Sequence, residues 1–317
     1  SDLPRVPPPP AQALAESEIR IPVVRIGDAV LEALFAGAGK SPAALQSEID
    51  ATMKQASMPL SGAHVDLRIA LEERRRGESA NVAGLIPGRD PALAHETILF
   101  TAHYDHDGDW DGRLRPGADD NASGTAGLIE LARAYARNPE PPRRTLLFLA
   151  LTAEERGLLG AWHYVANPLR PLSGARAVIN FDMIGRDETP SRQTDGLIEI
   201  SPDTSNELGL IGTNYSPEYR AVVERENREI GLRLNYKWDA DAALNVFQRS
   251  DHFPFAVLGI PAVWWFTGFH PEYHQTSDTP DRLNFAKMEK IVRLAYLAGW
   301  RFAEETRPPA FRAIPEK

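Results

Sequence analysis

The sequence predicts an α/β fold, a three-layer α/β/α sandwich around a mostly parallel mixed sheet. From about residue 80 onward, short apolar segments alternate with longer segments whose apolar residues follow helical spacing. Two runs, 145–151 (TLLFLAL) and 260–266 (IPAVWWF), are apolar at consecutive positions, as expected of strands covered by helices on both faces. The chain has 317 residues, 43% of them hydrophobic and 25% charged, which is enough to bury a large core.

Each element of this fold has a sequence signal. The expected strands cover 81–86, 97–102, 145–151, 176–181, 196–201 and 260–266, and the expected helices cover 122–137, 157–167, 216–231 and 285–305. Polar residues follow several of these strands directly. Because ligands in such sheets bind beyond the carboxyl ends of the strands, we expect the functional site there.

The first 79 residues lack this alternation, so we expect an N-terminal segment of 1–79 and a catalytic domain of 80–317. The opening SDLPRVPPPP is no signal peptide and is typical of a trimmed terminus, which predicts removal of a leader and a secreted or periplasmic protein, with the cytoplasm left open. Within this segment we expect an extended tether at 4–10, strands at 19–26 and 64–72, and helices at 27–36 and 41–56.

Composition limits the partners and the kind of metal site. The formal net charge of −9 argues against nucleic acid as a partner. No apolar run approaches the ~18 residues needed to span a bilayer. The chain has no cysteine, so any metal must be held by histidines and carboxylates. The sequence predicts no particular oligomeric state.

Five short motifs follow strands and carry metal-ligating residue types. His103 and Asp105 follow the strand at 97–102, and the segment 117–124 (GADDNASG) contains the adjacent Asp119 and Asp120. Glu154 and Glu155 follow the apolar strand 145–151, where two carboxylates are costly unless each has a task. A turn, a helix cap or a solvated helix end would explain any one of these motifs alone.

The last two motifs complete the pattern. Asp182 follows the strand at 176–181, and His274 lies with Asp278 in the segment 273–279 (YHQTSDT) after the strand at 260–266. Two histidines and several carboxylates at one sheet edge predict a two-metal hydrolytic centre.

The motifs together resemble the zinc-dependent exopeptidases that include bacterial leucyl aminopeptidases, glutamate carboxypeptidases and glutaminyl cyclases. The resemblance covers about residues 80–305 and implies the zinc-exopeptidase (phosphorylase/hydrolase-like) fold with two zinc ions per chain. It implies that one zinc is held by His103, Asp119 and Asp182 and the other by Asp119, Glu155 and His274. Asp119 would bridge the ions next to a cis peptide bond to Asp120. Glutaminyl cyclases bind a single zinc and generally lack the first histidine, so His103 favours the two-metal peptidases.

The same resemblance implies a mechanism. Two zinc ions roughly 3.5 Å apart would activate a water held between them and polarise the scissile carbonyl. Glu154 would be the general base, and Asp105 would orient His103. The segment 250–252 (SDH) resembles a further family element, so we expect Asp251 and His252 to contact the ligands or the substrate, with an exposed loop as the alternative.

The predicted activity is removal of apolar residues from peptide N-termini. Trp264, Trp265 and Phe266 alternate along a strand that ends near His274, so at least one ring should face the cleft, and we expect Trp265 to contact the substrate. Acidic groups nearby suit a protonated α-amine. A carboxypeptidase or dipeptidase remains an alternative, although no residue stands out as the cation for a substrate carboxylate. A second alternative is a relative that binds peptides without cleaving them. The presence of Glu154 argues against it, because such a protein has no need of a general base.

Two features remain outside this pattern. Residues 19–75 resemble the segment that joins a protease-associated domain to the catalytic sheet in larger relatives, although no such domain is evident. The loop 103–111 is rich in aspartate, and alternation of Asp107, Asp109 and Asp111 could bind calcium. A solvated loop is the simpler interpretation, because the glycine and terminal glutamate of an EF-hand loop are missing.

Overall fold

The structure, a computed structural model, describes residues 24, 26–52, 54–68, 77–110, 112–241 and 244–312, with Trp110 described by its backbone alone. These residues belong to two compact units, an N-terminal unit that ends at Gly77 and a sheet unit that begins at Glu78. The predicted tether at 4–10, most of the predicted strand at 19–26 and Asp111 lie outside the described residues.

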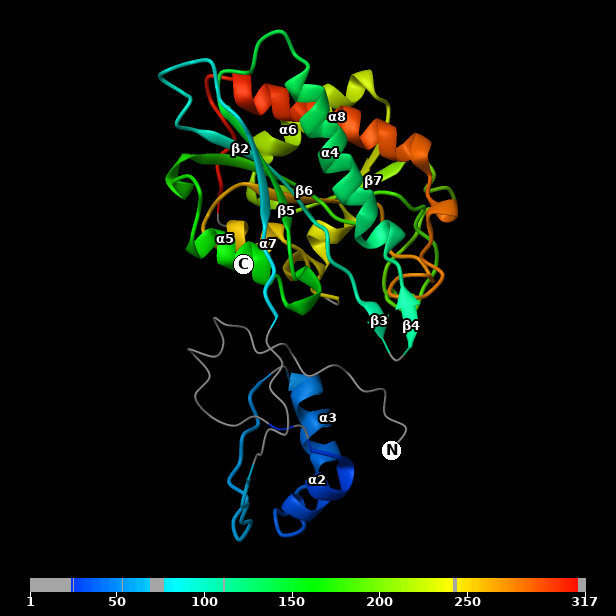
Figure 1. Cartoon of the computed structure of the whole chain (residues 1–317). Helices are drawn as coiled ribbons and strands as arrows, with labels where there is room; N and C mark the ends of the chain where they lie inside the picture. Colours follow the sequence, from blue (N-terminus) through cyan, green and yellow to red (C-terminus); the bar gives the residue numbers. More distant parts are fainter. Residues whose placement is uncertain are drawn as a thin grey trace. The chain divides into compact units, whose positions relative to one another are not determined.

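The described part of the N-terminal unit contains two helices, α2 (Asp28–Phe35) and α3 (Pro42–Thr52) (Figure 1). Ser41 caps α3, because its hydroxyl accepts a hydrogen bond from the amide of Ala44 at 3.2 Å. Neither helix contains a fully buried residue. The described part of the predicted strand at 64–72, residues 64–68, is not a strand.

The sheet unit is built around seven strands in the order β1-β5-β2-β6-β9-β7-β8. Neighbours from β5 to β9 pair in parallel, as do β7 and β8, whereas β1–β5 and β7–β9 are antiparallel. The carboxyl ends of β5, β2, β6 and β9 therefore meet at one edge of the sheet. The strands are β1 (Val82–Ile86), β2 (Thr97–His103), β5 (Thr145–Leu151), β6 (Ala175–Phe181), β7 (Glu207–Ile211), β8 (Arg233–Asn235) and β9 (Ala262–Phe266), and a separate ribbon pairs β3 (Gly108–Trp110) with β4 (Arg113–Arg115).

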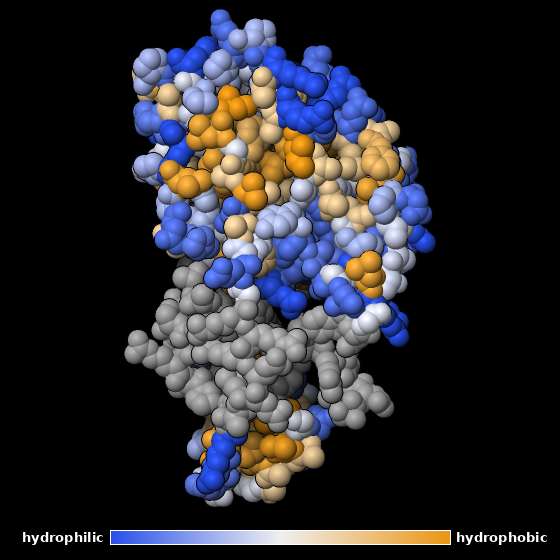
Figure 2. All heavy atoms as spheres, viewed as in Figure 1, coloured by the Kyte–Doolittle hydropathy of each residue, from blue (hydrophilic) through white to orange (hydrophobic). Residues whose placement is uncertain are grey.

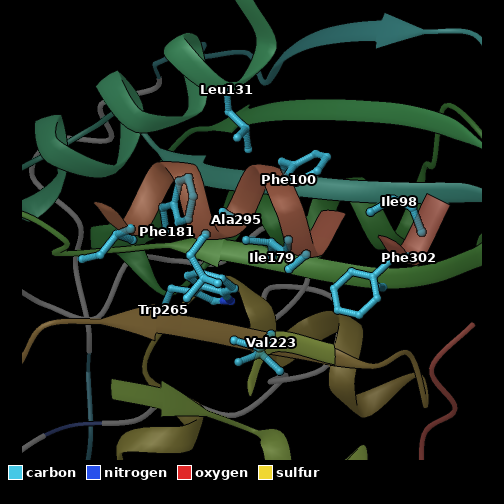
Figure 3. Packing of buried hydrophobic residues seen from close by; sticks show 14 of the residues in the cluster. Ile98, Phe100, Leu131, Ile179, Phe181, Val223, Trp265, Ala295 and Phe302 are labelled. Carbon is cyan, nitrogen blue, oxygen red and sulfur yellow. The ribbon is translucent and has the colours of Figure 1, made fainter. Parts of the chain in front are cut away.

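Helices cover both faces of this sheet, which confirms the predicted three layers (Figure 1). One face carries α4 (Gly124–Ala136), α6 (Pro217–Glu226) and α8 (Phe285–Glu304), and the other carries α5 (Leu159–Ala166) and α7 (His252–Val257). Alternation along β2 divides the core: Phe100 packs with Leu131 and Phe302 on the first face (Figure 3), whereas Leu99 packs on the second.

The predicted strand at 196–201 is wrong. These residues form turns and irregular structure, and the backbone is left-handed where the segment begins, at Asp195 and Gly196, with φ of 39° and 74°. The next apolar run along the chain becomes β7 instead, fully buried and paired with β9. Two short apolar runs compete here, and only pairing with the rest of the sheet selects one of them.

The surface of the sheet unit is not uniformly polar. Figure 2 shows apolar side chains gathered on the face that carries α4 and α8. A groove in the sheet unit is lined in part by Leu131, Ile230, Val292 and Tyr296. Within the described ranges, no helix is both long and apolar enough to cross a membrane.

Candidate active site

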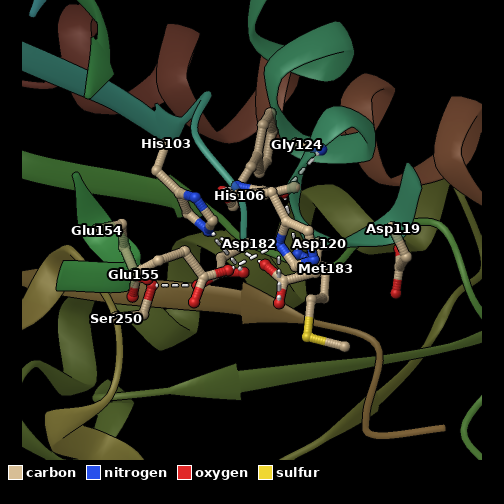
Figure 4. A network of polar contacts seen from close by, with 12 residues as sticks. His103, His106, Asp119, Asp120, Gly124, Glu154, Glu155, Asp182, Met183 and Ser250 are labelled. Carbon is tan, nitrogen blue, oxygen red and sulfur yellow. Dashed lines mark hydrogen bonds and ion pairs between the residues drawn. The ribbon is translucent and has the colours of Figure 1, made fainter. Parts of the chain in front are cut away.

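The predicted ligand residues from four separate chain segments converge at the carboxyl edge of the sheet (Figure 4). His103 is the last residue of β2, Asp182 follows β6 directly, and Glu155 lies in the turn after β5. His274 comes from the loop after β9. Each residue therefore enters the site from a strand end whose position is fixed by the buried sheet.

Asp120 occupies the centre of this group. Its Oδ1 lies 3.3 Å from Nε2 of His103, and its Oδ2 lies 3.0 Å from Nε2 of His274. One carboxylate thus faces both imidazoles, each with a different oxygen. The peptide bond that follows, Asp120–Asn121, is cis.

The prediction that Asp119 bridges two metal ions is therefore wrong by one residue, because Asp120 occupies that position. The Asp119 side chain points away from the cluster (Figure 4), where its Oδ1 accepts a 2.6 Å hydrogen bond from the amide of Gly185. Its Oδ2 lies 3.2 Å from Nε2 of the buried His270. The cis bond also lies one position later than predicted, after Asp120 and not before it.

The site divides into two adjoining clusters that could each hold a cation. His103, Glu154 and Asp182 form the first cluster, in which Nε2 of His103 is 3.4 Å from Oδ1 of Asp182. The second cluster contains Asp120, Glu155, His274 and His106, a residue that the sequence analysis missed. A histidine three residues after His103 was the available signal.

The residues present fit two zinc ions. Nε2 of His103 and Nε2 of His274 are buried and have no hydrogen-bond partner among the described residues, yet each faces two carboxylate oxygens at 3.0–3.4 Å. Ligand atoms about 2.0–2.1 Å from a tetrahedral zinc are roughly 3.3 Å apart. Imidazoles and carboxylates with this spacing, and without thiolates, match the chemistry of zinc.

Backbone geometry helps to aim these side chains. Ala153, Met183 and His274 are non-glycine residues with left-handed backbones, at φ of 54°, 58° and 55°. Such conformations cost free energy and are concentrated at functional sites. Ala153 directs Glu154 and the next glutamate toward the cluster, and Met183 turns the chain immediately after Asp182.

Asp105 contacts the turn that carries Glu154 and Glu155 as well as its predicted partner, His103. Its carboxylate accepts hydrogen bonds from the amides of Glu154 at 3.1 Å and Glu155 at 3.3 Å. The same carboxylate is 3.8 Å from Nδ1 of His103, which lies closer, at 3.1 Å, to the backbone carbonyl of Asp105. The Asp105 side chain thus fixes the glutamate turn, and its main chain orients His103.

Asp278 holds the backbone on which Asp120 sits. This fully buried carboxylate accepts hydrogen bonds from the amide of Asp119, at 3.1 and 3.0 Å, and from the amide of Asp120, at 3.2 Å. Its contact with the candidate ligands is therefore indirect, through the position of Asp120.

A chain of buried hydrogen bonds orients Asp182. Thr101 donates to Asn180 at 2.6 Å, Asn180 donates to Ser250 at 2.8 Å, and Ser250 donates to Oδ2 of Asp182 at 2.6 Å. Trp264 adds a 2.8 Å hydrogen bond from Nε1 to the backbone carbonyl of Asp182. Oδ1 of Asp182 is left facing His103.

Asp251 and His252 are buried and do not form the exposed loop considered as an alternative. Neither carboxylate oxygen of Asp251 has a hydrogen-bond partner in the described part of the chain. Burial, reinforced by the carboxylates of Asp182 and Asp105, raises the Asp251 pKa to about 8, although His103 opposes this shift. His252 packs its ring on Trp264 at 5.8 Å between centroids, and burial lowers its pKa to about 3.

Trp264, and not the predicted Trp265, faces the site. Trp265 points into the core between the sheet and α6, where its Nε1 donates to the hydroxyl of Tyr219 at 3.0 Å (Figure 3). Trp264 lines the cavity above the clusters. The rings alternate along β9 as predicted, but Trp264 faces the cavity and Trp265 faces the core.

This cavity has a volume of about 290 Å³ and a mixed lining. One part of the wall is acidic and another is apolar, and Arg249 supplies a cation. The lining residues are Asp120, Glu154, Glu155, Asp182, Met183, Arg249, Trp264, Phe269 and Tyr273.

The environment of Glu154 favours the protonated form of its carboxyl group. Burial raises its pKa well above the usual value, the neighbouring carboxylates of Asp182 and Asp251 raise it further, and His103 opposes the shift. A carboxylate whose pKa is raised accepts a proton more readily near neutral pH.

Asp107, one of the three aspartates considered for calcium, contacts His274. Its Oδ2 lies 3.3 Å from Nδ1 of His274, and this contact is the main cause of its lowered pKa. Carboxylates of this kind fix the orientation of ligating histidines. Asp109 is exposed, so the described loop does not gather its aspartates around one point.

Comparison with known proteins identifies the family of the chain. Residues 81–298 match Peptidase family M28. YfbL of Escherichia coli is 28% identical over 214 residues, which cover 62% of this chain and 64% of that protein. Aminopeptidase YwaD of Bacillus subtilis is 26% identical over 239 residues, covering 73% of this chain and 46% of that protein.

The chain thus spans about half to two thirds of the length of these relatives. The fold matches a solved structure of BSAP, a zinc aminopeptidase from Bacillus subtilis, with a TM-score of 0.55, 24% identity and coverage of 72% of this chain and 51% of that one. The family match covers most of the sheet unit and includes both candidate clusters. The chain belongs to peptidase family M28.

Proposed function

We propose that the chain is a two-zinc aminopeptidase that removes apolar residues from the N-termini of peptides. The observation that carries this proposal is the position of Asp120, whose two oxygens face His103 and His274 at 3.3 and 3.0 Å. A carboxylate shared between two adjoining clusters is the arrangement that holds two metal ions close together.

The candidate ligands form two sets, one for each zinc ion. His103, Asp182 and Oδ1 of Asp120 would hold one zinc, and Oδ2 of Asp120, Glu155 and His274 would hold the other. Zinc at these positions would supply Lewis acidity toward the scissile carbonyl and lower the pKa of a nearby water.

Glu154 performs the proton transfers. Its carboxylate lines the cavity beside the first cluster, so it takes the proton of the attacking water and delivers it to the leaving amine. The buried hydrogen bonds from Ser250 to Asp182 and from the Glu154 amide to Asp105 hold the reacting groups in place.

The lining of the cavity suits a substrate whose N-terminal residue is apolar and carries a free amine. Met183, Trp264 and Phe269 offer a surface on which a Leu-sized side chain would gain roughly 1.5–3 kcal/mol by burial. The empty space beside these side chains is small, about 290 Å³ with the adjoining solvent included. The acidic wall attracts a protonated α-amine, which a blocked peptide lacks.

Cleavage of Leu-p-nitroanilide and its N-acetyl derivative tests this proposal. The zinc-loaded protein should cleave the free form well and the acetylated form hardly at all. Equal rates for the two would show that the amine is not recognised. Loss of activity on chelation and its return with zinc would tie the activity to the metal.

A carboxypeptidase or dipeptidase activity is the second candidate, and Arg249 favours it. This exposed residue lines the cavity with its guanidinium 5.2 Å from the centre of the Phe269 ring, and it forms no ion pair with other described residues. A free guanidinium there could bind a substrate carboxylate. Dipeptides and their C-terminal amides separate the two activities: an aminopeptidase cleaves both, whereas a carboxylate-reading enzyme cleaves the free acid and loses that preference in Arg249→Met.

A further inference from the structure

We propose that His106 is a fourth protein ligand of the metal held by Asp120, Glu155 and His274. This metal site would then be filled by protein groups and would retain its ion more tightly than the neighbouring site. The inference rests on the metal binding proposed above, and it adds a residue and a difference between the two sites.

Distances support a four-ligand cluster. Nδ1 of His106 lies 2.7 Å from Oε1 of Glu155 and 3.9 Å from Oδ2 of Asp120. On the other side, Nε2 of His274 lies 3.0 Å from Asp120 and 3.4 Å from Glu155. These separations bracket the roughly 3.3 Å expected between ligand atoms around a tetrahedral zinc. One donor atom from each of the four residues lies within 4.8 Å of the other three.

The imidazole of His106 is buried and packs closely against Gly117. The His106 side chain is 7% exposed, and its ring centre is 5.1 Å from that of His274. Gly117 has a left-handed backbone, with φ of 64°, and a Cβ there would lie 2.5 Å from Cγ of His106. A side chain at position 117 would displace the imidazole, so glycine there preserves the cluster.

The two clusters differ in the number of protein ligands that they offer. Carboxylates of both clusters line the cavity, Glu154 and Asp182 from the first and Asp120 and Glu155 from the second, whereas His106 lies behind them and adds a fourth donor to the second cluster alone. Zinc sites with four protein ligands are typically structural, and sites with three keep a position for water or substrate. The open position therefore belongs to the ion beside His103, on the side where Glu154 can transfer protons.

Metal titration of the full chain tests the assignment without relying on activity. Cobalt added to metal-free wild-type protein should first give the intense visible absorption of a four-coordinate ion, and the second equivalent should bind more weakly. A weak first spectrum, typical of higher coordination, would overturn the proposal.

Two variants separate a ligand from a residue that only positions Glu155. His106→Gln keeps a hydrogen-bond donor toward Glu155, and His106→Phe keeps the ring volume. If His106 is a ligand, both variants should lose more than about 100-fold in affinity at the tight site, beyond the usual effect of losing a hydrogen-bonding neighbour of a ligand. Both should also alter the first cobalt spectrum.

The exposed His163 provides the matched control, since His163→Ala should change neither readout. Wild-type affinity and spectrum in His106→Gln would show that His106 only positions Glu155 and would overturn the inference. Failure of the wild-type protein to bind any metal would instead refute the proposed function.

Discussion

Removal of the Asp278 carboxylate should both destabilise the sheet unit and weaken metal binding. In Asp278→Ala the amides of Asp119 and Asp120 lose their shared acceptor inside a fully buried site. Each unsatisfied buried donor costs about 1–3 kcal/mol, so the expected loss is about 2–6 kcal/mol. In a domain of this size that loss corresponds to a fall in melting temperature of at least about 4 °C.

Asp278→Asn is the matched variant for this test. Oδ2 of Asp278 alone accepts from both amides, at 3.0 and 3.2 Å, so an asparagine oxygen in its place keeps both hydrogen bonds. Calorimetry in a chelator measures stability, and competition with a zinc indicator measures affinity. If the alanine and asparagine variants melted together and both bound zinc as the wild type does, Asp278 would not hold the Asp120 backbone in position.

The remaining predictions concern catalysis, orientation and protonation. Glu154→Gln should lower turnover at least ~10²-fold with zinc content unchanged, and loss of zinc would make Glu154 a ligand instead. Ser250→Ala removes the hydrogen bond to Asp182 and should weaken zinc binding about 10–100-fold, while unchanged affinity would show that the hydrogen bond is dispensable. Burial disfavours protonation of metal-free His274, but Asp107 and Asp120 outweigh it and raise its pKa to about 10. Zinc must displace that proton below pH 10, so zinc affinity should rise with pH by at least about tenfold per unit between pH 6 and 8. Calorimetry in two buffers should detect the released proton.

Much of the site could be predicted because its residues follow apolar strands. The bounds predicted for β5 agree with the structure, and the strand before His103 was predicted to within one residue. A carboxylate directly after a buried strand must lie at the edge of the sheet, because its position does not depend on the conformation of the following loop. The same reasoning predicts that Glu155 and Asp182 lie at the sheet edge where His103 ends β2.

The errors arise where position depends on loop conformation or strand parity. Asp119 and Asp120 are chemically identical neighbours, so the conformation of the backbone, and not the residue type, decides which one faces the histidines. His106 lies in an aperiodic loop, where its spacing of three residues from His103 was the available signal for a contact with the second cluster. Alternation along β9 required one tryptophan to face the cavity, but the choice of Trp264 depends on how β9 pairs with β6 and β7.

Anomalous X-ray scattering from zinc-loaded crystals tests the central claim most directly. Two zinc peaks should flank Asp120, one beside His103 and Asp182 and the other beside Glu155 and His274. A single peak, or a peak beside Asp119 with none at Asp120, would contradict the two-metal account.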